Sequence, residues 1–224
     1  MEGFAANLTE LDAVAARFVP GAAEHRYEDR THRSLSDEEI MKDWQVRMMQ
    51  SMAEAATRQH RDILEIGFGR GISAEFIQQC GVKSLTIIEC NDSVVERFNR
   101  WRARHAAQDI RLVHARWQDA LQQLSTYDAI FVHTYPLNEK KYMEKPLNSA
   151  KFAQHFLENA ASLLHPGGVL TYLSNEIDSL SRRHQRALSR HFSRTLTTVI
   201  PLPIPANVVD TWWADTMIAV QAFK

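Results

Sequence analysis

Three closely spaced glycines and one distant carboxylate are the residues of this chain whose spacing is typical of a ligand site. The stretch 67–71 (GFGRG) follows the apolar run 62–66, and a second apolar run, 85–88, ends at Glu89. Glycine lets a backbone turn approach a ligand closely, because no Cβ intervenes. A carboxylate at the end of the second strand can accept hydrogen bonds from both hydroxyls of a ribose. The pattern therefore predicts a strand, glycine turn, helix and strand that together bind a nucleoside.

The details of the turn indicate which class of nucleotide it binds. A dinucleotide fingerprint, G-x-G-x-x-G, requires a glycine where this chain has Ile72, and the Gly-Lys-Ser/Thr of a phosphate-binding loop is absent. The form E-x-G-x-G-x-G, which starts at Glu65, together with the acid-ended strand resembles motifs I and II of class I S-adenosylmethionine (SAM) methyltransferases. The structural alternative is an ordinary tight turn between a strand and a helix in some other α/β protein.

Composition limits the class of protein. The chain has 224 residues, of which 45% are hydrophobic and 24% charged, as is typical of one soluble α/β domain. The formal net charge of -1 argues against a nucleic-acid partner. Cys80 and Cys90 are too few for a disulfide framework, and no signal peptide or membrane-spanning apolar run appears. We therefore expect a cytoplasmic monomer or homodimer that binds neither nucleic acid nor membrane.

The elements that must position the site alternate along the chain. Strands are predicted at 62–67, 84–89, 110–115, 127–134, 168–174, 194–202 and 213–223, and helices at 71–80, 92–105, 117–124, 148–164 and 178–191. Only a proline-rich loop separates the last two strands, so they should form an antiparallel hairpin. The prediction is an α/β, Rossmann-like class I methyltransferase fold: a seven-stranded, mostly parallel sheet with an antiparallel terminal hairpin, plus an N-terminal helical lid. Residues 1–57 would form this helical arm, and residues 58–224 the SAM-binding domain.

The arm carries helical signals of its own. Apolar spacing predicts a helix over 8–18, and Ser36 with Glu39 forms a capping box that should begin a second helix. Methionine and tryptophan recur along one face of this second helix. The stripe packs on the sheet as core, or it covers the ligand, where soft sulfur and an aromatic ring suit a sulfonium.

Several blocks of sequence resemble guanidinoacetate N-methyltransferase. They are residues 40–49 (IMKDWQVRMM), 64–69 (LEIGFG), 87–92 (IIECND) and 134–137 (TYPL), supported by 115–119 (ARWQD) and 164–172 (LHPGGVLTY). The resemblance covers about residues 36–175 and implies a SAM site. The implied cofactor-binding residues are Met41, Trp44, Met49, Glu65, Gly67, Phe68, Gly69, Gly71, Ile72, Ser73, Glu89, Cys90, Asn91, Trp117, Gln118 and His133.

Two departures from that family concern its substrate. The resemblance implies two carboxylates that hold a guanidinium and take its proton, but this chain has Gln45 and His133 at those positions. A buried guanidinium without its paired charges costs several kcal/mol, on the order of 3–5. The SAM site should therefore carry over, whereas guanidinoacetate should not be the substrate.

A reaction with an acceptor other than guanidinoacetate needs an unprotonated nucleophile held in line with the sulfonium. His133 follows the fourth predicted strand, where open α/β sheets place their ligands, and an imidazole suits a general base. The structural alternative is that His133 only hydrogen-bonds a neighbour. Candidate catalytic residues are His133, Tyr135, Asn138, Tyr172 and Gln45, with Asn175 as a further polar contact. No His or Cys spacing suggests a metal site.

Two reactions remain open at this point. The first is alkyl transfer from SAM to a small molecule, which we expect to belong to bacterial secondary metabolism. The second resembles azetidine-2-carboxylate synthase: the amine of SAM attacks its own γ-carbon, which gives azetidine-2-carboxylate and methylthioadenosine without a separate acceptor. A non-catalytic SAM-binding module and an NAD-dependent reductase rank below these two, the latter because of Ile72.

Overall fold

A computed structural model of the chain describes residues 30–58, 61–134, 149–174, 176–205 and 214–224. The helix expected at 8–18, the candidate catalytic residues Tyr135 and Asn138, and Asn175 lie outside the described residues.

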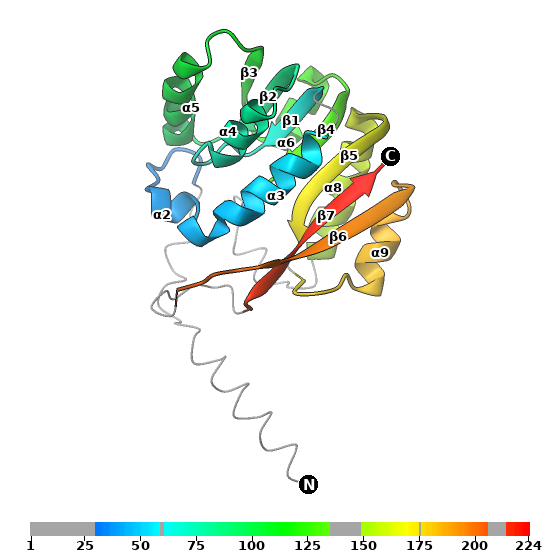
Figure 1. Cartoon of the computed structure of the whole chain (residues 1–224). Coiled ribbons are helices and arrows are strands. Elements are labelled where there is room, and N and C mark those ends of the chain that lie inside the picture. Colours follow the sequence, from blue (N-terminus) through cyan, green and yellow to red (C-terminus); the bar gives the residue numbers. More distant parts are fainter. Residues whose placement is uncertain (1–29, 59–60, 135–148, 175, 206–213) are drawn as a thin grey trace.

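Seven strands of the described chain form one sheet in the order β3-β2-β1-β4-β5-β7-β6 (Figure 1). Their bounds are β1 Asp62–Ile66, β2 Ser84–Glu89, β3 Ile110–His114, β4 Tyr127–Val132, β5 Leu164–Ser174, β6 Arg194–Pro201 and β7 Thr216–Phe223. Strands β1 to β5 are parallel, and β7 runs antiparallel to both of its neighbours. The predicted sheet and its antiparallel terminal hairpin are therefore confirmed.

Helices cover both faces of this sheet. The helical elements are α2 Asp37–Ile40, η3 Asp43–Gln45, α3 Val46–Ala56, α4 Ile72–Gln79, α5 Asp92–Arg104, α6 Trp117–Ala120, η4 Leu121–Gln123, α8 Ser149–Leu163 and α9 Arg182–Leu188. One apolar core lies between the sheet and α3, α4 and α5, and a second lies between the sheet and α6, α8 and α9. Because both faces are covered, the central strands read as continuous apolar runs rather than alternating ones.

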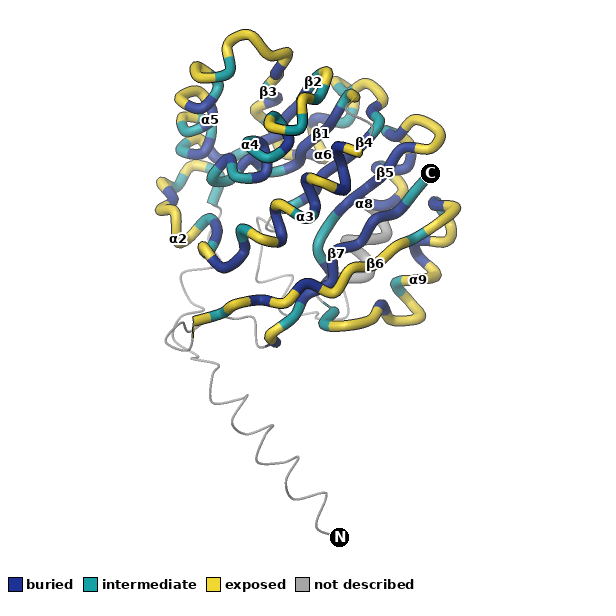
Figure 2. Tube along the Cα trace, in the orientation of Figure 1, coloured by how far each residue is buried: buried dark blue, intermediate teal, exposed yellow. Residues whose placement is uncertain are grey.

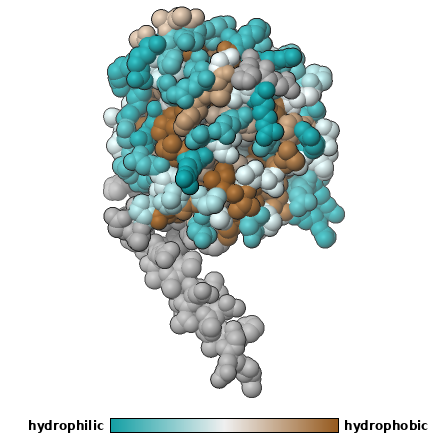
Figure 3. Space-filling view, in the orientation of Figure 1, coloured by the Kyte–Doolittle hydropathy of each residue, from teal (hydrophilic) through white to brown (hydrophobic). Residues whose placement is uncertain are grey.

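Burial decreases toward the β6 edge of the sheet. Figure 2 shows dark blue along the central strands and mostly yellow along β6. The exposed large hydrophobic residues of the described chain, Leu196 and Val199, lie on that strand. On the face drawn in Figure 3, hydrophobic residues form small groups among hydrophilic ones. None of the described helices is both long enough and apolar enough to cross a membrane.

The prediction of one continuous helix after Ser36 is wrong. Ser36 does cap α2 in a capping box with Glu39, but α2 ends after one turn because Met41 is extended, with φ -161° and ψ 137°. The chain then forms η3, in which the Gln45 side chain accepts a hydrogen bond from the Lys42 amide at 2.8 Å. Only α3, from Val46 onward, packs on the sheet as a regular helix.

Three other boundaries also differ from those predicted. The helix expected at 117–124 divides into α6 and η4, and the helix expected at 178–191 is confined to α9, which Ser181 caps by accepting from the His184 amide. Strand β5 begins at Leu164, before the glycines that were expected to start it. Its pairing with β4 shifts register between Tyr127 and Ala129, and this irregularity accommodates the turn-like sequence inside the strand.

A row of polar residues crosses the sheet beneath α3. The pairing registers align Glu65 of β1, Phe131 of β4, Thr171 of β5 and Gln221 of β7. Glu65, Thr171 and Gln221 are all buried, and each has one oxygen without a hydrogen-bond partner. Unsatisfied buried groups of this kind cost stability, on the order of 1–3 kcal/mol each. This face of the sheet is thus less stable than its apolar packing alone would make it.

We expect Thr171→Val to raise the free energy of unfolding by about 1 kcal/mol, because it removes an unpartnered hydroxyl and keeps the shape of the side chain. Urea denaturation measures the change. The matched control is Thr57→Val, which should lower stability, because the Thr57 hydroxyl donates to the Ala53 carbonyl at 2.8 Å. Destabilisation by Thr171→Val as large as that of the control would contradict the expectation.

Candidate functional site

The glycine turn between β1 and α4 has a backbone that only glycine accommodates. Gly67, Gly69 and Gly71 all have positive φ, at 92°, 54° and 76°. A Cβ on Gly67 would lie 2.3 Å from the His133 carbonyl oxygen, and one on Gly71 would lie 2.6 Å from the Phe68 ring. The turn therefore packs against its own phenylalanine and against the end of β4, and its backbone faces the pocket.

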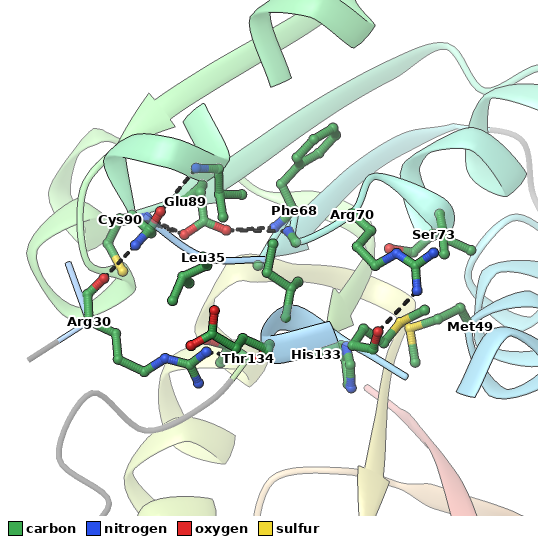
Figure 4. A pocket seen from close by; sticks show the side chains of 18 residues that line it. Arg30, Leu35, Met49, Phe68, Arg70, Ser73, Glu89, Cys90, His133 and Thr134 are labelled. Carbon is green, nitrogen blue, oxygen red and sulfur yellow. Dashed lines mark hydrogen bonds between the residues drawn. The ribbon is translucent and has the colours of Figure 1, made fainter. Parts of the chain in front are cut away.

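Glu89 holds this turn in place. Its Oε2 accepts hydrogen bonds from the amides of Phe68 at 3.0 Å and Gly69 at 3.4 Å, and its Oε1 accepts from Cys90 at 2.7 Å and Asn91 at 2.9 Å. The carboxylate is buried and points into the space between the two loops (Figure 4). One side chain thus fixes the glycine turn after β1 relative to the loop after β2.

A second buried carboxylate lies behind the other end of the pocket. The Ser73 hydroxyl, in the first turn of α4, donates to Glu65 Oε1, while Glu65 Oε2 has no partner. Burial, with a smaller contribution from the charge of Glu89, raises the pKa of Glu65 to about 8. Glu65 is therefore largely protonated at neutral pH, and a cationic ligand group nearby would favour its ionised form.

The segment 30–41 forms one wall of the pocket. The Asn91 amide donates to the Arg33 carbonyl at 2.8 Å and also to the Arg30 carbonyl, and the Leu35 amide donates to Ser93 Oγ at 3.1 Å. Arg70 donates to the Met41 carbonyl at 3.0 Å and to Asp43 at 2.7 Å. The loops that begin the site, after β1 and β2, thus also hold the segment that covers it.

The pocket has two chemically different ends. Figure 4 shows Glu89, Cys90 and Arg30 at one end, and Ser73, Met49 and Arg70 at the other. The full lining set is Arg30, Leu35, Glu39, Ile40, Met41, Met49, Gly67, Phe68, Gly69, Arg70, Ile72, Ser73, Glu89, Cys90, Asn91, Val94, His133 and Thr134.

His133 lies on the Met49 side of this pocket, directly after β4. Its backbone amide donates to the Ile66 carbonyl at 3.1 Å, which fixes its position relative to β1. The ring is partly exposed to the pocket, and burial by surrounding protein lowers the pKa of His133 to about 4. The imidazole is therefore neutral at physiological pH and holds an added proton poorly.

Other candidates from the sequence lie outside the pocket lining. Trp44 and Gln45 are buried in η3, and the Trp44 indole N–H has no partner. Trp117 packs edge-on against Phe156, with ring centroids 5.3 Å apart. The remaining four are Glu65, behind Ser73, Gly71, the exposed Gln118 and Tyr172, whose hydroxyl contacts His184.

Sequence reasoning missed four residues of the covering wall, Arg30, Leu35, Glu39 and Ile40. Their contribution depends on the path of segment 30–41, which no local pattern specifies. It also missed that His184 contacts both Tyr172 and Glu176. The described residues contain no group of three His, Cys, Asp or Glu side chains arranged to hold a metal ion.

SAM fits these residues on two observations. The glycine turn brings its backbone to the pocket, and it faces a carboxylate suited to ribose hydroxyls. The unpartnered oxygen of Glu65 lies behind the opposite end, where Met49 offers a polarisable sulfur.

Comparison with known proteins also indicates a methyltransferase. A family model for guanidinoacetate N-methyltransferase matches residues 12–199. Protein arginine N-methyltransferase 2 of Aspergillus fumigatus is 27% identical over 180 residues, which are 75% of this chain and 40% of that protein. The corresponding protein of Eremothecium gossypii is 27% identical over 138 residues, which are 57% of this chain and 30% of that protein. The chain thus spans less than half the length of these curated relatives.

Two solved structures share the architecture. Precorrin-6y C5,15-methyltransferase of Geobacter metallireducens superposes with a TM-score of 0.58 at 13% identity, covering 87% of this chain and 99% of that one. The N-methyltransferase NodS of Bradyrhizobium japonicum superposes with a TM-score of 0.56 at 14% identity, covering 80% of this chain and 96% of that one. At these identities the likeness shows a common fold, the class I methyltransferase fold.

We expect Glu89→Gln to weaken SAM binding at least about tenfold, because a charge-assisted acceptor of backbone N–H groups becomes an amide that can accept at only one atom. Titration calorimetry with SAM measures the affinity. The control is Glu96→Gln, which changes an exposed carboxylate on α5 and should leave the affinity unchanged. Equal affinities of Glu89→Gln and wild type would contradict this role.

Glu65 should make stability depend on pH. Its folded-state pKa of about 8 lies above the ordinary value of 4.5, so its contribution is fully present below pH 4.5 and is lost as pH rises through 8. We expect the free energy of unfolding to fall between pH 5 and 8 by on the order of 1 kcal/mol per unit. Glu65→Gln should remove this part of the slope, as denaturation series at several pH values will show. An unchanged slope in the variant would count against the raised pKa.

Proposed function

The chain belongs to the guanidinoacetate N-methyltransferase family, and from this premise we propose that it is a SAM-dependent transferase that alkylates a small molecule other than guanidinoacetate. Family membership and fold support SAM-dependent methyl transfer. The identity of the acceptor rests on the residues at the far end of the pocket from Glu89.

In this proposal, residues of the described chain would contact each part of SAM. Glu89 and the amides of the glycine turn would hold the adenosine, with Cys90 and Asn91 beside it. Ser73, with Glu65 behind it, would face the charged end, and Met49 would contact the sulfonium. When bound, SAM supplies an alkyl carbon activated by its positively charged sulfur.

The observation that carries the proposal is the missing pair of negative charges. Gln45 has its amide oxygen committed to the Lys42 amide at 2.8 Å, and His133 is neutral. Of the carboxylates that line the pocket, Glu89 lies at the opposite end from His133, and Glu39 pairs with Ser36 and Arg33. A buried guanidinium would therefore lack its counter-charges, which supports a neutral or anionic acceptor.

The same observation favours a second candidate, cyclisation of SAM to azetidine-2-carboxylate and methylthioadenosine. That reaction needs no acceptor site, so the loss of both acceptor-binding carboxylates would carry no cost. It would use Met49 and the neutral His133 only to shape the space around the methionine chain.

Incubation of the full chain with SAM alone separates the two candidates. Methyl transfer predicts little consumption until the small-molecule fraction of a cell extract is added, followed by S-adenosylhomocysteine. Cyclisation predicts methylthioadenosine and a cyclic amino acid from SAM alone. If neither product forms although SAM binds, both candidates are wrong.

Wild-type protein saturated with S-adenosylhomocysteine should show no binding of guanidinoacetate by calorimetry. The double variant Gln45→Glu, His133→Asp should gain measurable binding, because it supplies two carboxylates where the family places them. Methylation of guanidinoacetate by the wild type at millimolar substrate would contradict the proposed exclusion of that acceptor.

A further inference from the structure

Arg70 places a positive charge at the Met49 end of the pocket (Figure 4). It belongs to the glycine turn 67–71, and its side chain is 20% exposed. The other arginine that lines the pocket, Arg30, lies at the Glu89 end. Of the described residues that line this pocket, Arg70 is thus the one whose guanidinium lies at the end away from Glu89.

The protein uses only part of the Arg70 guanidinium. Nη1 donates to the Met41 carbonyl at 3.0 Å and to Asp43 Oδ1 at 2.7 Å. Asp37 Oδ2 lies 3.9 Å from Nε, which is too far for a hydrogen bond, and Asp37 Oδ1 binds Arg97. No hydrogen bond from Nε or Nη2 to the described residues is present. These two nitrogens share one edge of the planar group, where they form a fork that matches a carboxylate.

The cofactor that the pocket would hold carries one anionic group. SAM and S-adenosylhomocysteine end in an amino acid, whose carboxylate lies beyond the sulfur from the adenosine. Because Glu89 is suited to the ribose, the amino-acid part would extend toward the opposite end, where Met49 and Arg70 lie. A carboxylate buried without a paired charge is costly, so this end needs a cation. His133 does not supply it, because burial lowers its pKa to about 4.

We propose that the Arg70 guanidinium binds the amino-acid carboxylate of the cofactor through Nε and Nη2, and so selects cofactors that keep this carboxylate. This inference rests on the proposed function and applies to both candidate reactions, because each starts from intact SAM. Nη1 stays bound to the Met41 carbonyl and to Asp43, which fixes the direction of the fork. Asp37 and Asp43 are 56% and 79% exposed, so water and salt screen their repulsion of the ligand carboxylate.

Ligands without a sulfonium, which cannot react, separate carboxylate recognition from the rest of the site. They are S-adenosylhomocysteine, its decarboxylated analogue and methylthioadenosine, which lacks the whole amino-acid part. Calorimetry measures their affinities for the full chain. We expect wild type to bind S-adenosylhomocysteine at least about tenfold more tightly than the decarboxylated analogue, because the analogue loses a charge-assisted pair. Arg70→Gln should reduce this preference to about threefold or less, and Arg70→Lys should keep part of it, because lysine retains the charge but not the fork.

Arg97→Gln is the matched control. Arg97 holds the same wall through the Leu35 carbonyl at 3.1 Å and through Asp37, but it does not line the pocket. Loosening the wall should weaken the binding of all these ligands by a similar factor. The preference for the carboxylate should therefore persist in this variant.

The role of Arg70 is overturned if wild type shows no preference for the carboxylate, or if the preference is the same in Arg70→Gln as in wild type. The second result is what an arginine that only holds the wall would give. The first result needs no variant, and Arg70→Lys tests the fork if Arg70→Gln does not fold. Wild type that binds none of the ligands removes the proposed function as well, whereas equal binding of S-adenosylhomocysteine and its decarboxylated analogue removes the role of Arg70 alone.

Discussion

The Glu89 carboxylate, which accepts hydrogen bonds from four backbone amides, is the interaction on which the site depends. Two of these amides belong to the glycine turn after β1 and two to the loop after β2. A buried carboxylate needs such donors to offset its lost hydration. Because Asn91 of the same loop also binds the covering segment through Arg30 and Arg33, the position of the pocket wall follows from the same contacts.

The opposite end of the pocket is defined by the charge it lacks. Where the family uses two carboxylates, this chain has an amide committed to its own helix and a neutral imidazole. The glycine turn and Glu89 thus match the family's pattern, whereas neither of the two acceptor positions carries a carboxylate.

The parts of this structure that the sequence predicted are those with local causes. The glycine turn follows from three positive-φ positions, and the central strands follow from runs buried on both faces. A lid was predicted, but the path of its segment 30–41 was not, because that path is set by Asn91, Ser93 and Arg70, which are distant in sequence. The break at Met41 was missed because the apolar spacing continues across it, although the backbone is extended there. The Tyr172–His184 contact likewise joins elements whose approach only the tertiary structure shows.

A crystal structure of the full chain with S-adenosylhomocysteine tests the central claim most directly. The account predicts the ribose hydroxyls within hydrogen-bond distance of the Glu89 carboxylate, the glycine turn against the ligand and the sulfur near Met49. Density for the ligand elsewhere on the protein, or a ribose that makes no contact with Glu89, would contradict it.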